Sequence, residues 1–164
     1  MAYGVIRTDK VSGENVFADM LSFRFYNGAT PAEVENGVIV ELEGLDTNKH
    51  EIYKAKAATS QSQLQNCAVA AGVELMYDER KRSLDEFINE AGRPVRGYTL
   101  RHRNIYSFTK ECFVGGTAPT KGASVGIGTG GKIDASGTGL GTCIDIDTAG
   151  KYTFYAIQIG AVAD

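Results

Sequence analysis

The sequence predicts a mainly β protein with one short helix (α+β), in which an antiparallel N-terminal sheet precedes a small β-barrel or sandwich rich in glycine and threonine. Short runs that alternate apolar and polar residues recur along the chain, separated by glycine and Asn-Gly turn signals. Twelve of the 20 glycines lie between Gly115 and Gly160, where charge is sparse. Only one stretch has helical spacing. The 164 residues suffice for one domain or for two small ones that share a surface.

The first half of the chain is expected to contain an arm and an acidic sheet. In residues 1–15, Tyr3 and Val5 lie among glycines and charged residues without a sustained period, which is typical of a terminus that becomes ordered on docking. Residues 16–92 form the acidic β-rich segment, with strands expected at 21–25, 38–43, 51–59 and 73–77. The turn signals between the first three strands predict an antiparallel meander.

The acidic segment ends in the predicted helix. Ser83 and Glu86 have the spacing of a capping box, while Gly92 and Pro94 mark the end of the helix. One apolar helical face is formed by Leu84, Phe87, Ile88 and Ala91. The helix spans only about two to three turns, so it depends on tertiary packing.

Residues 93–164 form the expected barrel or sandwich. Strands are predicted at 95–100, 105–113, 124–127, 132–134, 142–147 and 151–162. The first two are joined by a tight and strongly basic hairpin tip, Arg101-His102-Arg103-Asn104.

Charge is distributed unevenly. Residues 1–79 carry a formal net charge of −6, residues 80–110 one of +5, and residues 111–164 one of −2. The basic middle indicates solvated faces, an internal layer of salt bridges, or a surface that meets an acidic partner. The total of −3 and the pI of about 5.4 argue against a general nucleic-acid binder.

Cysteine and histidine usage argues against a disulfide framework and a metal site. Cys67, Cys112 and Cys143 are odd in number and widely spaced, so they are expected to be small buried hydrophobes in a reducing compartment. With two histidines and no CxxC pair, no metal site is expected. No apolar run reaches the roughly 18 residues of a membrane span, and no secretory signal is expected at the N-terminus.

Three motifs come close to a known chemistry without completing it. Residues 126–132 have phosphate-loop spacing, but Ile133 replaces the hydroxyl residue and no helix follows. Asp145 and Asp147 resemble the start of a calcium loop that lacks its later ligands. Cys112 and His102 share a hairpin, but the thiol is expected to be buried. We therefore expect no catalytic residue, no cofactor and no enzymatic activity.

A longer stretch, residues 74–113, has a more specific pattern and is followed by the glycine-rich β segment. The residues that carry this pattern are Tyr77-Asp78-Glu79-Arg80, Ser83-Leu84-Asp85-Glu86-Phe87, Gly92, Arg96-Gly97-Tyr98, Ile105-Tyr106-Ser107-Phe108-Thr109 and Gly150-Lys151. Through these residues, the chain between residues 73 and 160 resembles the capsid decoration (cement, or auxiliary head) proteins of tailed bacteriophages. The chain differs from that pattern at the hairpin tip, where Arg101-His102-Arg103-Asn104 replaces the usual Lys-Gly-Asp.

The resemblance implies a structural virion protein that binds the outer surface of the major capsid protein lattice and stabilises the expanded head. Such a protein is made in the host bacterial cytoplasm, resides on the capsid exterior, and contacts neither nucleic acid nor a membrane. It can also form a homo-oligomer, either a trimer or a dimer. A phage tail, fibre or host-surface-binding module is the alternative. The expected contacts come from the arm and the basic tip, although the tip can also be an exposed hairpin without a partner; they are Tyr3, Val5, Ile6, Arg7, Arg101, His102 and Arg103.

Overall fold

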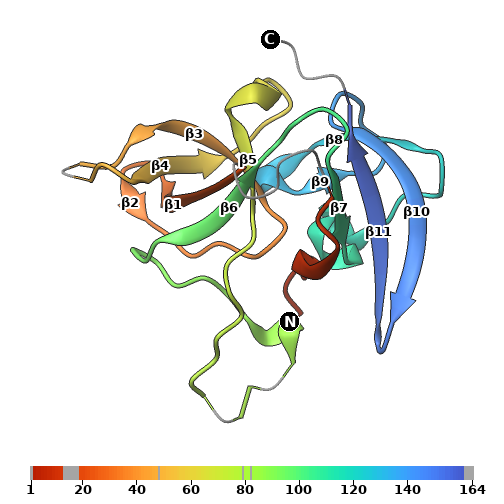
Figure 1. Ribbon diagram of the computed structural model, residues 1–164, viewed down its shortest axis with the longest axis horizontal. Helices are drawn as coiled ribbons and strands as arrows, with labels where there is room; N and C mark the ends of the chain where they lie inside the picture. Colours follow the sequence, from red (N-terminus) through yellow and green to blue (C-terminus); the bar gives the residue numbers. More distant parts are fainter. Residues whose placement is uncertain (1, 13–18, 48, 79, 82, 161–164) are drawn as a thin grey trace.

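The computed structural model describes residues 2–12, 19–47, 49–78, 80–81 and 83–160. It contains two β units that lie side by side (Figure 1). The prediction of a mainly β protein with a barrel is confirmed. The barrel, however, is built mostly from the N-terminal half, and not from the glycine-rich C-terminal half where the sequence predicted it.

The first unit is a closed five-stranded barrel. Its strands follow the order β1 (Met20–Asn27), β4 (Ile52–Ala57), β3 (Ile39–Leu45), β5 (Cys67–Ala70) and β6 (Val95–Thr99). Closure occurs because β6 pairs with both β5 and β1. The short strand β2 (Thr30–Pro31) pairs with the end of β1. Strand β6 thus belongs to the barrel although it lies beyond the boundary expected at residue 92.

The predicted antiparallel meander is wrong, because β4 lies between β1 and β3. Strand β4 is antiparallel to β3 but parallel to β1, with Phe23 opposite Tyr53. Residues 28–38 connect β1 to β3, which do not pair with each other, and the later strand β4 lies between them. Sequence spacing identified the strands, but the order in which they pair depends on contacts between distant residues.

The second unit is an open sheet with the order β7 (Ile105–Phe108), β11 (Tyr152–Ile159), β10 (Gly141–Ala149), β8 (Ser124–Ile127) and β9 (Ile133–Asp134). The N-terminal segment, residues 2–12, runs along the outer side of β7 through bridges from Ile6 to Phe108 and from Ser12 to Ile105. The predicted strand at 105–113 ends at Phe108, because two 3-10 turns follow it.

One strand joins the cores of the two units. Ala68 and Ala70 of β5 pack inside the barrel with Phe23. Cys67 and Val69 point the other way, into a cluster that includes residues of the second sheet such as Phe108. Both faces of β5 are therefore buried, which explains why its four residues are small and apolar without alternation.

The predicted helix is also wrong, since only a 3-10 turn at Leu84–Glu86 forms. Its capping box between Ser83 and Glu86 is present, as the local sequence predicts. Immediately afterwards Phe87 adopts an extended conformation, and Asn89 forms a bridge with Val34. Tertiary pairing thus overrides the helical spacing. The remaining 3-10 turns are Thr8–Lys10, Leu64–Asn66, Lys110–Cys112, Val114–Gly116 and Thr129–Gly131.

Candidate functional site

The longest connection between strands of the fold is the loop of residues 71–94, which joins β5 to β6 and is called the 71–94 loop below. Figure 1 shows that it projects from the junction of the two units, close to the N-terminus. Among the described residues of the loop, the turn Leu84–Glu86 is the only helix or strand. Loops longer than about 12–15 residues without their own secondary structure are uncommon in compact domains and are usually either functional segments or linkers.

The first part of this loop exposes large apolar side chains. Val73, Leu75 and Tyr77, called the apolar row below, are 53%, 65% and 90% exposed. The alternate residues Glu74 and Met76 are half-buried. The sequence predicted a half-buried strand at 73–77, which is wrong, because this segment pairs with no other strand of the described chain. The amides of Met76 and Tyr77 donate no hydrogen bond to another described residue.

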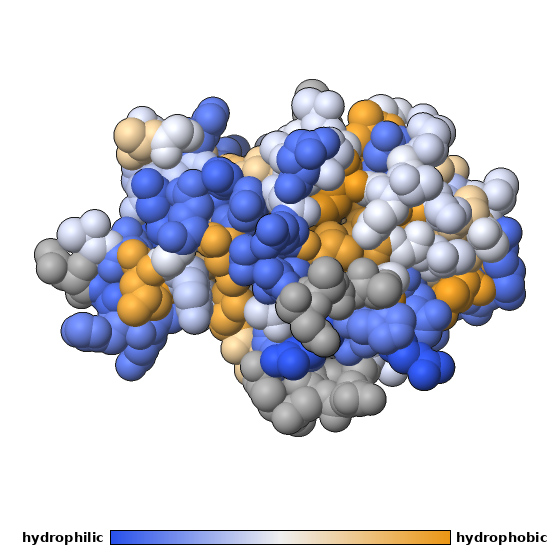
Figure 2. All heavy atoms as spheres, turned by 90° about the horizontal axis from the view of Figure 1, so that it is seen from above, coloured by the Kyte–Doolittle hydropathy of each residue, from blue (hydrophilic) through white to orange (hydrophobic). Residues whose placement is uncertain are grey.

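The apolar row is unusual for this surface. Of the nine large hydrophobic residues that are exposed in the described part of the chain, four lie within residues 73–84. Figure 2 shows the molecule from above, where hydrophilic side chains cover much of the barrel half and apolar side chains form separate groups. Exposed apolar residues concentrated in one segment mark an interaction site more often than scattered ones do.

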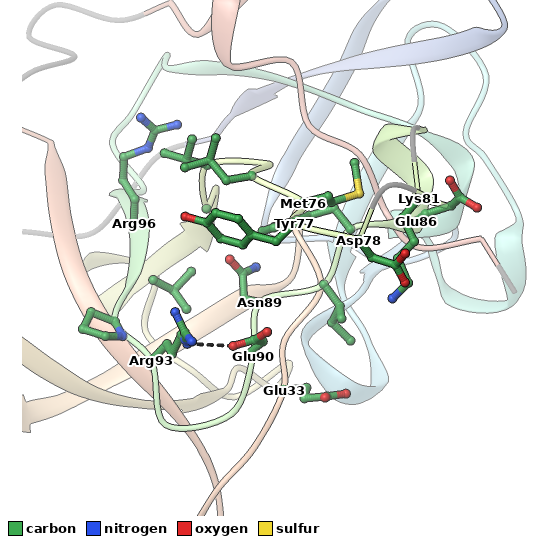
Figure 3. A pocket seen from close by; sticks show the side chains of 17 residues that line it. Glu33, Met76, Tyr77, Asp78, Lys81, Glu86, Asn89, Glu90, Arg93 and Arg96 are labelled. Atoms are coloured by element: carbon green, nitrogen blue, oxygen red, sulfur yellow. Dashed lines mark ion pairs between the residues drawn. The ribbon is translucent and has the colours of Figure 1, made fainter.

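A groove of about 530 Å³ lies beside the apolar row. Figure 3 shows Met76, Tyr77 and Asp78 from one limb of the loop, and Glu90 and Arg93 from the other. An ion pair of 2.7 Å joins Arg93 Nε to Glu90 Oε2. The wall is mixed in character, with the apolar side chains of Leu75, Met76, Phe87, Ile88, Pro94 and Val95 next to both acidic and basic ones.

Buried amide groups hold the base of the loop. The Asn36 side chain donates to the carbonyl of Gly72 (3.0 Å) and accepts from its amide (2.8 Å). The Asn89 side chain donates to Asn36 Oδ1 and to the carbonyl of Val34, both at 2.9 Å. Because these groups satisfy one another away from water, the two limbs of the loop are fixed together where they leave the barrel.

A second attachment holds the loop through Asp85. Its carboxylate accepts hydrogen bonds from Lys151 Nζ (2.9 Å) and from the Tyr152 hydroxyl (2.7 Å). Its backbone carbonyl accepts from the Tyr3 amide at 2.9 Å. The hydrogen bond from Lys151, followed by that from Tyr152, holds the pKa of Asp85 below its ordinary value. The loop is therefore held at its base and again at Leu84–Glu86, and the apolar row lies between the two attachments.

The structure corrects the predicted role of the N-terminal arm. Val5 and Ile6 are each only 2% exposed, so their side chains belong to the core and are unavailable to a partner. Tyr3 is half-buried. The Arg7 guanidinium pairs with Asp9 and Asp147, and its hydrogen bond to Asp9 raises the pKa of Arg7.

The basic hairpin tip is exposed, but part of it is structural. Arg101 forms an ion pair with the buried Asp19, whose other carboxylate oxygen accepts from Asn104 Nδ2 at 3.0 Å. The Arg103 amide donates to the carbonyl of Ile159, at the end of β11. The predicted arm residues lie beside Phe108 and the first half of β11, where Arg7 stacks on the Phe154 ring. The tip lies at the other end of β11, so the structure does not bring the predicted arm and tip residues together. His102 and Arg103 remain exposed at the tip.

The incomplete motifs are part of the structural framework. Lys132 donates to Glu35 (3.3 Å) and to the carbonyl of Glu111 (3.0 Å). Asp145 and Asp147 pair with Lys121 and Lys10, both at 2.8 Å. Within the described residues, no three His, Cys, Asp or Glu side chains gather where they could hold a metal ion.

The three cysteines are buried and free, as the sequence predicted. Burial raises the pKa of Cys67 and of Cys112 to about 12. Both thiols are therefore protonated at neutral pH, which makes them poor nucleophiles.

Sequence reasoning missed the apolar row because its alternation is the same as that of a half-buried strand. The sequence does contain a signal for a long exposed loop, because the residues between Tyr77 and the next strand, which begins at Val95, are strongly charged.

Comparison with known proteins does not assign the chain to a family. No family model, curated protein or solved structure matches it. Among the described residues, no helix is long and apolar enough to cross a membrane.

Proposed function

We propose that this chain is a structural virion protein that binds the outer surface of the major capsid protein lattice of a tailed bacteriophage and stabilises the expanded head. The observation that carries the proposal is the apolar row, exposed on a loop that is held at both sides. The 71–94 loop also lies within the stretch whose sequence resembles capsid decoration proteins. The proposal therefore combines an exposed binding surface with a sequence likeness in the same segment.

The energetics of the apolar row suit such a role. Complete burial of an apolar side chain of this size in an interface contributes about 1.5–3 kcal/mol. Because the loop is already attached at Asn89 and at Asp85, little conformational entropy is lost when it binds. A copy that contacts several capsid subunits gains further through effective concentration, so modest individual contacts suffice.

The basic tip supplies a secondary contact in this proposal. His102 and Arg103 are exposed and can contact an acidic capsid surface. Val5 and Ile6 are buried, so they are not among the proposed contacts. The protein acts by binding and not by catalysis, without a cofactor, on the capsid exterior after synthesis in the host cytoplasm. Copies of the chain can also associate with one another.

A phage tail, fibre or host-surface-binding module is the second candidate. The observation that favours it is the groove beside Tyr77, where an aromatic ring lies near carboxylate, amide and guanidinium groups. Such a surface can hold a polar ligand of the cell surface through hydrogen bonds and ring contacts.

Sedimentation with particles separates the two candidates. The purified protein is mixed with expanded heads, with unexpanded heads and with host cells, and the bound fraction is measured. The proposal predicts saturable binding to expanded heads, with density on the capsid exterior in cryo-electron microscopy. Binding to host cells without binding to heads supports the second candidate and contradicts the first.

A further inference from the structure

We propose that Asp85 is the positioning residue of the 71–94 loop, and that it holds the apolar row in place by joining the loop both to the β10–β11 turn and to the N-terminal segment. The inference rests on the proposed function only for what the apolar row binds. The attachment itself depends on contacts within this chain.

Asp85 joins its own loop to two segments that are distant from it in the sequence. The Asp85 carboxylate contacts Lys151 and Tyr152, which follow the turn after β10, and the Asp85 carbonyl contacts the amide of Tyr3. Lys151 Nζ also donates to Ser83 Oγ at 3.0 Å. The side chain and the carbonyl of Asp85 therefore link the loop to the start of β11 and to the N-terminal segment.

The turn that carries Asp85 is locally rigid. The Glu86 side chain accepts from the Ser83 amide at 3.0 Å, which completes the capping box around Leu84–Glu86. Leu84 lines a hollow of about 240 Å³ together with Val5, Tyr152 and Phe154. Asp85 is thus presented by a fixed turn, with its carboxylate directed at donors on the second sheet.

Loss of the carboxylate removes the hydrogen bonds from Lys151 and Tyr152 but leaves the Asp85 carbonyl bonded to the Tyr3 amide. The second attachment of the loop is then weaker, and the apolar row would sample a wider range of positions. Because the site is partly solvated, loss of the charge is expected to change the opening equilibrium of the loop by about fivefold.

Asp85→Asn tests the inference in the full chain, and Asp145→Asn is the matched control. Asp145 also accepts from a lysine, Lys121, but lies on β10 away from the loop. Hydrogen exchange is read at the amides of Glu86 and Phe87, which donate to Ser83 and Leu84. We expect about fivefold faster exchange at these amides in Asp85→Asn, and no change there in the control or in barrel strands of either variant.

Two spin labels measure the position of the apolar row directly. One label is placed by Tyr77→Cys and one on the barrel by Thr59→Cys, while the native thiols are buried and protonated. The distribution of label distances is expected to widen in Asp85→Asn and to narrow again when Asp85→Lys is combined with Lys151→Asp. An unchanged distribution in Asp85→Asn overturns the inference. Exchange that rises equally throughout the barrel also overturns it, because this indicates a general loss of stability.

The two proposals fail in different ways. If Asp85→Asn loosens the loop but the wild-type protein binds no heads, the positioning role stands and the capsid proposal fails. If the wild-type protein binds heads and Asp85→Asn has unchanged exchange and label distances, the capsid proposal stands and the positioning role fails.

Discussion

The N-terminal segment and the 71–94 loop are two irregular segments with opposite arrangements of their apolar residues. In the N-terminal segment, Val5 and Ile6 are buried, and Ile6 packs in the cluster that joins β5 to the second sheet. In the 71–94 loop, Leu75 and Tyr77 are held in an exposed position although a buried amide network fixes the base of the loop. The sequence predicted the reverse, with an arm that docks on a partner and a half-buried strand in the loop.

This difference separates a segment that completes the fold from one that is available to a partner. The N-terminal segment supplies the backbone partner that the edge of β7 would otherwise lack, with Ile6 opposite Phe108. The apolar row of the 71–94 loop pairs with no strand of the described chain, so its exposed side chains contribute little to the fold. Binding energy is therefore expected from the loop, and folding energy from the N-terminal segment.

The largest expected effect is a contrast in stability between Ile6→Ala and Leu75→Ala. Truncating the buried Ile6 should lower the free energy of unfolding by about 2–5 kcal/mol, because it removes core contacts and leaves a cavity. Truncating the exposed Leu75 should change it by less than about 0.5 kcal/mol. Urea unfolding of the two variants measures this directly. Equal destabilisation by both would remove the distinction between the two segments.

A smaller effect is expected at the base of the loop. A Cβ at Gly72 would overlap Asn89 Oδ1, so Gly72→Ala should disrupt the buried amides and lower the free energy of unfolding by about 1–3 kcal/mol. Gly160→Ala is the control, because a Cβ there makes only ordinary contacts. Thermal and urea unfolding measure both variants. Neutral behaviour of Gly72→Ala would show that the two limbs of the loop are not held together as described.

The smallest expected effect is the pH dependence of the Asp85 attachment. The folded state lowers the pKa of Asp85, so its contribution to stability is complete above the unfolded pKa of about 3.9 and is lost as the pH falls through the lower folded value. At pH 7 the free energy of unfolding of the wild type should be higher than that of Asp85→Asn by at most about 1 kcal/mol, because the site is partly solvated. The difference should disappear as the pH is lowered below about 4, which urea unfolding at successive pH values can follow. A difference that stays constant with pH would mean that the carboxylate charge is not responsible.

Local patterns predicted most of the strands of this fold but not their partners. Alternation and turn signals are properties of neighbouring residues, which is why β1, β3, β6 and β11 were expected close to where they form. Closure of the barrel depends on β6 pairing with β1, across more than 70 residues, and no local pattern encodes that pairing. The C-terminal placement of the barrel was inferred from glycine content, which reports turns and not closure.

The candidate site shows the same limit. The capping box of Ser83 and Glu86 formed as predicted, yet the helix did not continue because Asn89 pairs with the distant Val34. The alternation at residues 73–77 indicates one apolar side, but whether that side is buried depends on whether a neighbouring strand exists. The docking place of the N-terminal segment has the same limit, since the partner of Ile6 is Phe108, far along the chain.

The affinity of expanded heads for variants of the apolar row tests whether this row is the binding surface. The double variant Leu75→Ser with Tyr77→Ser is compared with Leu45→Ser, which alters an exposed leucine on the barrel strand β3. We predict that the double variant folds normally and binds heads at least about tenfold more weakly, from the loss of more than about 1.4 kcal/mol per site. Leu45→Ser should bind as the wild type does. A folded double variant that binds heads with wild-type affinity would show that the apolar row is not the binding surface.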